Sequence, residues 1–200
     1  MRIRHLRMVA AFIAAVALGS CSSGPERSVA EGPPRVQDDI CAIFAERPHW
    51  RDATVASAAR WGAPVAVQMA IMWRESSFRA EARPPQRYAM GVVPTGRLSS
   101  AYGFSQAIDG TWDWYRRESG NRDGRRNNFE DAADFVGWYM AKTEETNGLD
   151  MWDAYSQYLA YHEGHTGYRR GSYRAKDWLQ RAAGQVAYQA RRYDEQLRVC

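Results

Sequence analysis

One segment of the chain is almost wholly apolar and leads directly into a single carboxylate. The run from Pro64 to Trp73 reads PVAVQMAIMW, and Arg74 and Glu75 follow it. Proline suits the first turn of a helix, and a helix that is apolar on all sides is stable only inside a core. We therefore expect a buried helix that carries Glu75 at its end.

The expected burial would change the acid strength of Glu75. Desolvation disfavours the charged form of a carboxylic acid and raises its pKa. A general acid that works near neutral pH needs such a raised pKa. The alternative is a helix-end glutamate that pairs with a nearby arginine, and the apolar helix alone does not separate these two interpretations.

Beyond residue 37 the apolar residues recur at helical spacing almost throughout. Helices are predicted over 38–47, 51–61, 64–75, a short segment from 109 or 111, 129–148, 151–162 and 179–197. No long alternating strand pattern occurs, although the proline- and glycine-rich stretch 82–102 has room for a small hairpin. The length fits one domain, so we expect a mainly α domain over residues 38–200.

Three short motifs occur in this order along the chain: ESSF at 75–78, GFSQ at 103–106 and AYHEG at 160–164. Together they resemble the lytic transglycosylases of the soluble-transglycosylase type, whose patterns are ESxF, GLMQ and AYNAG. The second and third motifs of this chain differ from the family at their middle positions. The resemblance covers residues 55–170, and it implies a single lysozyme-like (goose-type) helical domain that cleaves peptidoglycan glycan strands, with any hairpin near the cleft.

The resemblance also implies the chemistry. Glu75 would protonate the leaving oxygen and later accept a proton, while the C6 hydroxyl of N-acetylmuramic acid attacks its own C1 and forms a 1,6-anhydro sugar. Such an intramolecular attack can replace a second catalytic group. Tyr161 is expected to hydrogen-bond Glu75 and orient it, unless it is simply a core tyrosine. The expected substrate-binding residues are Ser76, Tyr102, Ser105, Gln106 and Trp112, with the Gln106 amide suited to an N-acetyl group.

Two other functions remain open at this point. Glu163 replaces the alanine of the third motif, and helical geometry turns it by about 200° from Tyr161, away from Glu75. If Glu163 instead lay across the cleft, it could activate water and the protein would be a muramidase. The other alternative is a non-catalytic lipoprotein that binds the cell wall, although such a protein has no need of a glutamate in an apolar pocket.

Other chemistries fit less well. His162 and His165 are three residues apart, whereas the zinc motif HExxH needs four, and no phosphate-binding loop is present. We expect no metal and no cofactor. Without residues 1–20, Lys+Arg falls from 27 to 24 against 23 Asp+Glu, so the net charge drops from +4 to +1. We therefore expect no binding of nucleic acid.

The first 20 residues look like a bacterial lipoprotein signal peptide. Three arginines precede a short apolar stretch from 8 to 18, and the sequence LGSC ends at Cys21. Cys21 would carry the lipid, and residues 21–37 would form a flexible tether. The expected location is the periplasmic face of the outer membrane, with the inner membrane as the alternative. An ordinary signal peptide cut after Ser20 would leave Cys21 free.

Two cysteines, Cys41 and Cys200, remain in the predicted domain once Cys21 is assigned to lipid. In an oxidising periplasm an isolated pair of this kind usually forms a disulfide. The alternative is two buried free thiols. A bridge would join the first helix of the domain to its C-terminus.

Overall fold

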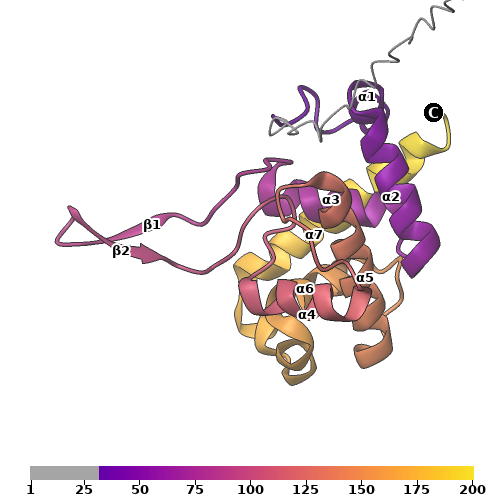
Figure 1. Ribbon diagram of the computed structural model, residues 1–200. Coiled ribbons are helices and arrows are strands. Elements are labelled where there is room, and N and C mark those ends of the chain that lie inside the picture. Colours follow the sequence, from indigo (N-terminus) through magenta and orange to yellow (C-terminus); the bar gives the residue numbers. More distant parts are fainter. Residues whose placement is uncertain (1–31) are drawn as a thin grey trace, which may run out of the picture.

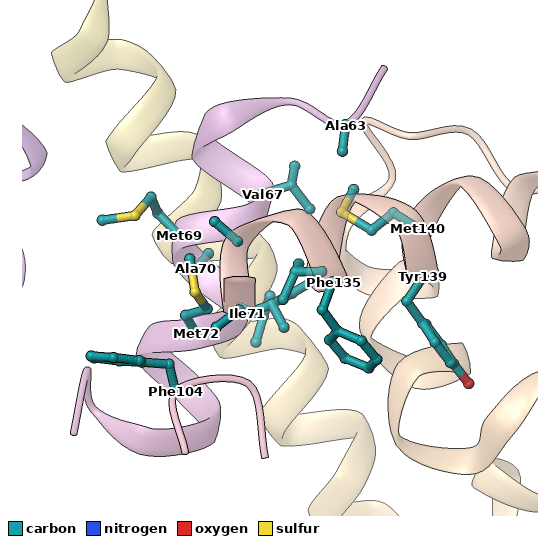
Figure 2. Close-up of a cluster of buried hydrophobic side chains, with 14 of the residues drawn as sticks. Ala63, Val67, Met69, Ala70, Ile71, Met72, Phe104, Phe135, Tyr139 and Met140 are labelled. Carbon is teal, nitrogen blue, oxygen red and sulfur yellow. The ribbon is translucent and has the colours of Figure 1, made fainter. Parts of the chain in front are cut away.

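The apolar helix α3 (Val65–Ser76) lies at the centre of the fold in the computed structural model, which describes residues 32–200 (Figure 1). It packs against α5 (Phe129–Asn147) and α7 (Asp177–Leu197). Figure 2 shows Val67 and Ile71 of α3 meeting side chains of α5 in this core. All seven residues from 66 to 72 are buried, as the sequence predicted.

The other helices surround this central one. They are α1 (Ile40–Glu46), α2 (Pro48–Trp61), α4 (Asp109–Ser119), α6 (Ala154–Arg170) and the 3-10 turn η1 (Ser172–Ala175). Each corresponds to a predicted helix except η1. The prediction was wrong about the end of α6, which continues past residue 162. The backbone leaves the helical conformation at Gly164 (φ 73°, ψ 159°), and the residues after it resume a helical path.

Helices α2 and α5 approach each other closely at Gly137. A Cβ atom at this position would overlap the Ser57 hydroxyl. That hydroxyl donates to the Ala133 carbonyl at 2.9 Å. A glycine on α5 therefore permits the contact that holds one wall of the core in place.

The two ends of the described chain lie together. A disulfide joins Cys41 of α1 to Cys200, with the Cα atoms 5.9 Å apart, which confirms the predicted pairing. Part of the predicted tether also contacts the domain: the Gln37 carbonyl accepts a hydrogen bond from Tyr193, and the Arg35 amide donates to Glu46. Cys21 and the predicted signal peptide lie outside the described residues. No helix within 32–200 is long and apolar enough to cross a bilayer.

A two-stranded antiparallel hairpin, β1 (Gln86–Ala89) and β2 (Val93–Arg97), extends away from the helices as an arm (Figure 1). Every residue of both strands is exposed. The fold is thus mainly helical with one small hairpin, as predicted, and is consistent with a lysozyme-like domain.

Candidate active site

A buried aromatic cluster holds the first two sequence motifs in place. The Trp50 ring stacks on Phe129 at 3.9 Å between ring centroids and contacts Phe78 and Phe104 at 5.5 Å each. Phe78 belongs to the ESSF motif and Phe104 to the GFSQ motif. Both phenylalanines are buried. These rings fix the turn that follows Glu75 and the loop that carries Gln106.

The chain turns sharply directly after Glu75. Ser77 (φ 51°) and Phe78 (φ 57°) both adopt left-handed backbone conformations. Two consecutive non-glycine residues in this region are uncommon and carry strain, which tends to occur at functional sites. The turn ends α3 at Ser76, sends Phe78 into the aromatic cluster and leaves Glu75 on the last turn of the helix.

Glu75 lines a cavity of about 440 Å³ at this end of α3. The loop between the hairpin and α4 forms one side of it, and α5 and the first half of α6 form the other. The residues that line it besides Glu75 are Ser99, Ala101, Gln106, Ala107, Ile108, Thr111, Phe135, Tyr139, Tyr161, His162, Glu163 and Gly164. Residues of all three motifs therefore meet in one cavity.

The surroundings of Glu75 favour its protonated form. Burial raises the pKa of Glu75 to about 7, while a hydrogen bond from Tyr158 and the positive charge of Arg74 act in the opposite direction. Desolvation outweighs both. The predicted alternative, a helix-end glutamate made acidic by an arginine, does not match this balance. At neutral pH Glu75 is therefore able both to give and to take a proton.

The tyrosine that interacts with Glu75 is Tyr158. We expected this role for Tyr161, but the Tyr161 hydroxyl donates to the Ser105 carbonyl at 2.6 Å. Both tyrosines lie on the first half of α6, three residues apart, so they share one face of the helix. This spacing was visible in the sequence, yet only packing decides which hydroxyl reaches the carboxyl. Tyr161 still lies close enough for the charge of Glu75 to raise its pKa further above the value set by burial.

Gln106 is held with its amide group at the cavity wall. Its backbone is left-handed (φ 50°), and its amide nitrogen donates to the Ala82 carbonyl at 2.9 Å and the Gly103 carbonyl at 2.8 Å. Gly103 (φ 79°) lies against the Arg126 backbone, where a Cβ atom would overlap the carbonyl. With the nitrogen engaged, the amide oxygen is the atom that Gln106 offers to a ligand.

Four other predicted binding residues do not line the cavity. Trp112 is buried in the core, packed on Phe135 at 5.2 Å, because α4 turns this face toward α5. Ser76 is buried and its hydroxyl donates back to the Met72 carbonyl, as serine often does inside a helix. Ser105 is buried as well, and contributes the carbonyl that accepts from Tyr161.

Tyr102, the fourth, lies at the root of the arm. Its hydroxyl donates to Glu81 at 2.5 Å, and the Arg83 guanidinium lies 4.0 Å from its ring centroid. The hydrogen bond from Tyr102 lowers the pKa of Glu81. Thr111 and Ile108 line the cavity in place of these four residues, and neither was predicted as a binding residue because neither belongs to a motif.

Glu163, which was predicted to face away from Glu75, lines the same cavity as Glu75. Along α6 the lining of the cavity runs from Tyr161 to Gly164, where the helical path breaks. The carboxylate is already engaged: Lys176 donates to it at 2.7 Å, and Ser172 and His162 also contact it. Burial opposes ionisation of Glu163, but these donors outweigh it and lower the pKa.

The two histidines of this segment point to different neighbours. His162 packs edge-on against Trp178, and His165 packs on Tyr139 with its ring nitrogen 3.1 Å from the Thr143 hydroxyl. Within residues 32–200 no group of three or more His, Cys, Asp or Glu side chains could hold a metal ion.

Comparison with known protein families identifies the family to which the chain belongs. The family model described as a transglycosylase SLT domain matches residues 9–200. No curated protein and no solved structure matches the chain.

Proposed function

Because the chain belongs to the transglycosylase SLT domain family, whose members are peptidoglycan lytic transglycosylases, we propose that it cleaves the β-1,4 bond between N-acetylmuramic acid and N-acetylglucosamine without adding water. The observation that carries this proposal is Glu75. It lies at the end of a buried helix, lines a cavity with residues of all three motifs, and has a pKa raised to about 7.

In the proposed reaction, protonated Glu75 donates to the glycosidic oxygen as the bond to C1 of N-acetylmuramic acid breaks. Positive charge develops at C1, as in other glycosidases. The C6 hydroxyl of the same sugar then attacks C1, and the Glu75 carboxylate accepts its proton. The product ends in 1,6-anhydro-N-acetylmuramic acid, and Glu75 returns to its protonated form.

The neighbouring side chains position these groups. The Tyr158 hydroxyl stabilises the Glu75 carboxylate that exists between the two proton transfers. Tyr161 ties α6 to the Ser105 carbonyl and so holds the GFSQ loop against the cavity. The Gln106 amide oxygen would accept a hydrogen bond from the N–H of an N-acetyl group on the substrate.

One observation favours a second candidate, a hydrolytic muramidase. Glu163 lines the same cavity as Glu75 and could in principle act as a base for water. Its hydrogen bonds from Lys176 and Ser172 argue against this role, because a carboxylate that is held by a cation and has a lowered pKa is a poor base. We therefore assign Glu163 a structural role at the break in α6.

For its location, we propose a lipoprotein attached through Cys21 to the periplasmic face of the outer membrane. The signal-like residues 1–20 and the LGSC sequence support this proposal. The Cys41–Cys200 disulfide is also in keeping with an oxidising compartment.

The test of catalysis is the release of soluble fragments from purified peptidoglycan. Wild-type protein should release them, and Glu75→Gln should not, while both should sediment with the insoluble wall. Equal sedimentation with no release by either protein would instead identify a wall-binding lipoprotein. Circular dichroism of both proteins is the control that tests whether the substitution leaves the fold unchanged.

A further inference from the structure

The arm formed by residues 86–97 takes no part in the proposed reaction. It extends away from the helices (Figure 1), and apolar side chains gather at its tip. Met90 is 94% exposed and Val92 76% exposed, and Tyr88 and Val93 beside them are also mostly exposed. A contiguous apolar group on an isolated projection marks a contact site.

The strand register shows that both faces of the tip are apolar. Tyr88 pairs with Pro94 and Ala89 pairs with Val93. Successive residues of a strand point to opposite faces, so the first pair covers one face and the second pair the other. A protein surface would cover one face of such a ribbon, whereas a lipid headgroup region surrounds a tip from all sides.

The charge along the arm is of one sign. Residues 82–108 contain three arginines and no aspartate or glutamate. Arg87 and Arg97 are exposed and form no ion pair with an acidic side chain of the described residues. Arginines behind an apolar tip complement a surface of anionic lipid, where each cation near the surface adds to binding.

We propose that the arm inserts its tip into the interfacial region of a membrane containing anionic phospholipid. Met90 and Val92 enter the boundary between headgroups and acyl chains, and Arg87 contacts lipid phosphates. The insertion is shallow, because the open edges of a two-stranded hairpin must keep their backbone groups hydrated. The insertion would also order a hairpin that has marginal stability in isolation.

The experiment measures the environment of position 90 in the full chain. The predicted leader could hold every variant on vesicles, so binding itself is not informative. Cys21→Ser removes the cysteine that lies outside the Cys41–Cys200 disulfide, and Met90→Cys then accepts an environment-sensitive fluorophore. Val55→Cys is the matched control, since Val55 is an exposed apolar residue of α2. Helix α2 lies on the opposite side of the domain from the arm (Figure 1).

With vesicles of phosphatidylethanolamine and phosphatidylglycerol, the label at position 90 should show a blue-shifted, several-fold brighter emission, and lipids that carry a quencher near the headgroup should reduce it. The label at position 55 should show neither. Arg87→Glu or high salt should weaken the effect, and phosphatidylcholine vesicles should give less of it.

Two outcomes would overturn the proposal. One is a label at position 90 that stays as exposed to water on anionic vesicles as the label at position 55. The other is a blue shift without lipid that grows with protein concentration, which would show that a second copy of the chain covers the tip. Neither outcome bears on Glu75, because fragment release from peptidoglycan is measured separately.

Discussion

Glu75 and Glu163 line the same cavity, yet their surroundings shift their pKa values in opposite directions. Glu75 follows an apolar helix and has only a tyrosine hydroxyl and a neighbouring arginine to offset burial. Glu163 lies at the break in α6, where Lys176, Ser172 and His162 surround its carboxylate. Burial alone therefore does not make an acid catalyst. What distinguishes Glu75 is burial without a cation that contacts the carboxylate directly.

The largest expected effect belongs to Glu75→Gln. General acid–base catalysis contributes about 100- to 10,000-fold, so we expect kcat to fall by at least ~100-fold. The measurement is the initial rate of fragment release from peptidoglycan. Glu163→Gln is the matched control, because it removes a carboxylate from the same cavity. A folded Glu75→Gln protein with near-normal turnover would remove Glu75 from the mechanism.

Lys176→Met is expected to make the setting of Glu163 more like that of Glu75. The nearly buried carboxylate loses its cation, so its pKa should rise and the free energy of unfolding at neutral pH should fall by about 1–3 kcal/mol. A pKa of Glu163 that is higher in the folded state than in the unfolded chain destabilises the folded protein only at pH values where this carboxylate is ionised in the unfolded chain. The loss should therefore shrink as pH falls through the unfolded value of about 4.

Denaturant unfolding at several pH values measures this change. Lys142→Met is the control, since Lys142 pairs with the more exposed Glu118 and Glu145 and should cost less than about 1 kcal/mol. Equal losses in the two variants, or a Lys176→Met loss that does not depend on pH, would show that Lys176 does not compensate the burial of Glu163.

Tyr158→Phe tests the one hydroxyl that stabilises ionised Glu75. Its loss should reduce kcat roughly 10-fold, the effect of about 1.4 kcal/mol, and should raise the pKa of Glu75. The alkaline limb of the pH profile of kcat/KM, expected near pH 7 in the wild type, should then move to higher pH, because the acid stays protonated longer. Tyr161→Phe should leave the alkaline limb at the pH of the wild type and should reduce kcat less than Tyr158→Phe does. A shift in Tyr161→Phe alone would return the orienting role to Tyr161.

Much of this arrangement could be predicted from the sequence. The apolar run before Glu75, the helical spacing elsewhere and the Cys41–Cys200 pair all lead to the observed fold, because each depends on local pattern or on simple counting. Which tyrosine reaches Glu75 depends on how α6 packs, and the motif pointed to Tyr161 although Tyr158 lies one helical turn before it. Trp112 shows the same limit, since an aromatic residue after a motif can face the cavity or the core.

Glu163 was harder to predict. Its helical position relative to Tyr161 suggested that it faces away from Glu75, but it lines the same cavity, directly before the break in α6 at Gly164. Its partners Ser172 and Lys176 come from the segment that folds back after this break. Such contacts depend on tertiary structure, and no local pattern reveals them.

The smallest effect on activity is expected for Glu163→Gln. If Lys176 and Ser172 hold Glu163 in a structural role, its replacement by an amide of similar size should reduce kcat by less than about 10-fold, below the range of a general acid or base. The measurement is again the rate of fragment release, with thermal unfolding to correct for any loss of stability. A decrease as large as that of Glu75→Gln would make Glu163 a second catalytic carboxylate.

The most direct test of the central claim is the mass of the sugar at the newly formed glycan end. Mass spectrometry of peptidoglycan digested by the wild-type protein separates 1,6-anhydro-N-acetylmuramic acid from the reducing sugar by one water. If Glu75 works without a second carboxylate, the anhydro end should dominate and Glu163→Gln should leave the product unchanged. Products that carry mainly reducing ends, and that disappear in Glu163→Gln, would contradict the account and identify a muramidase.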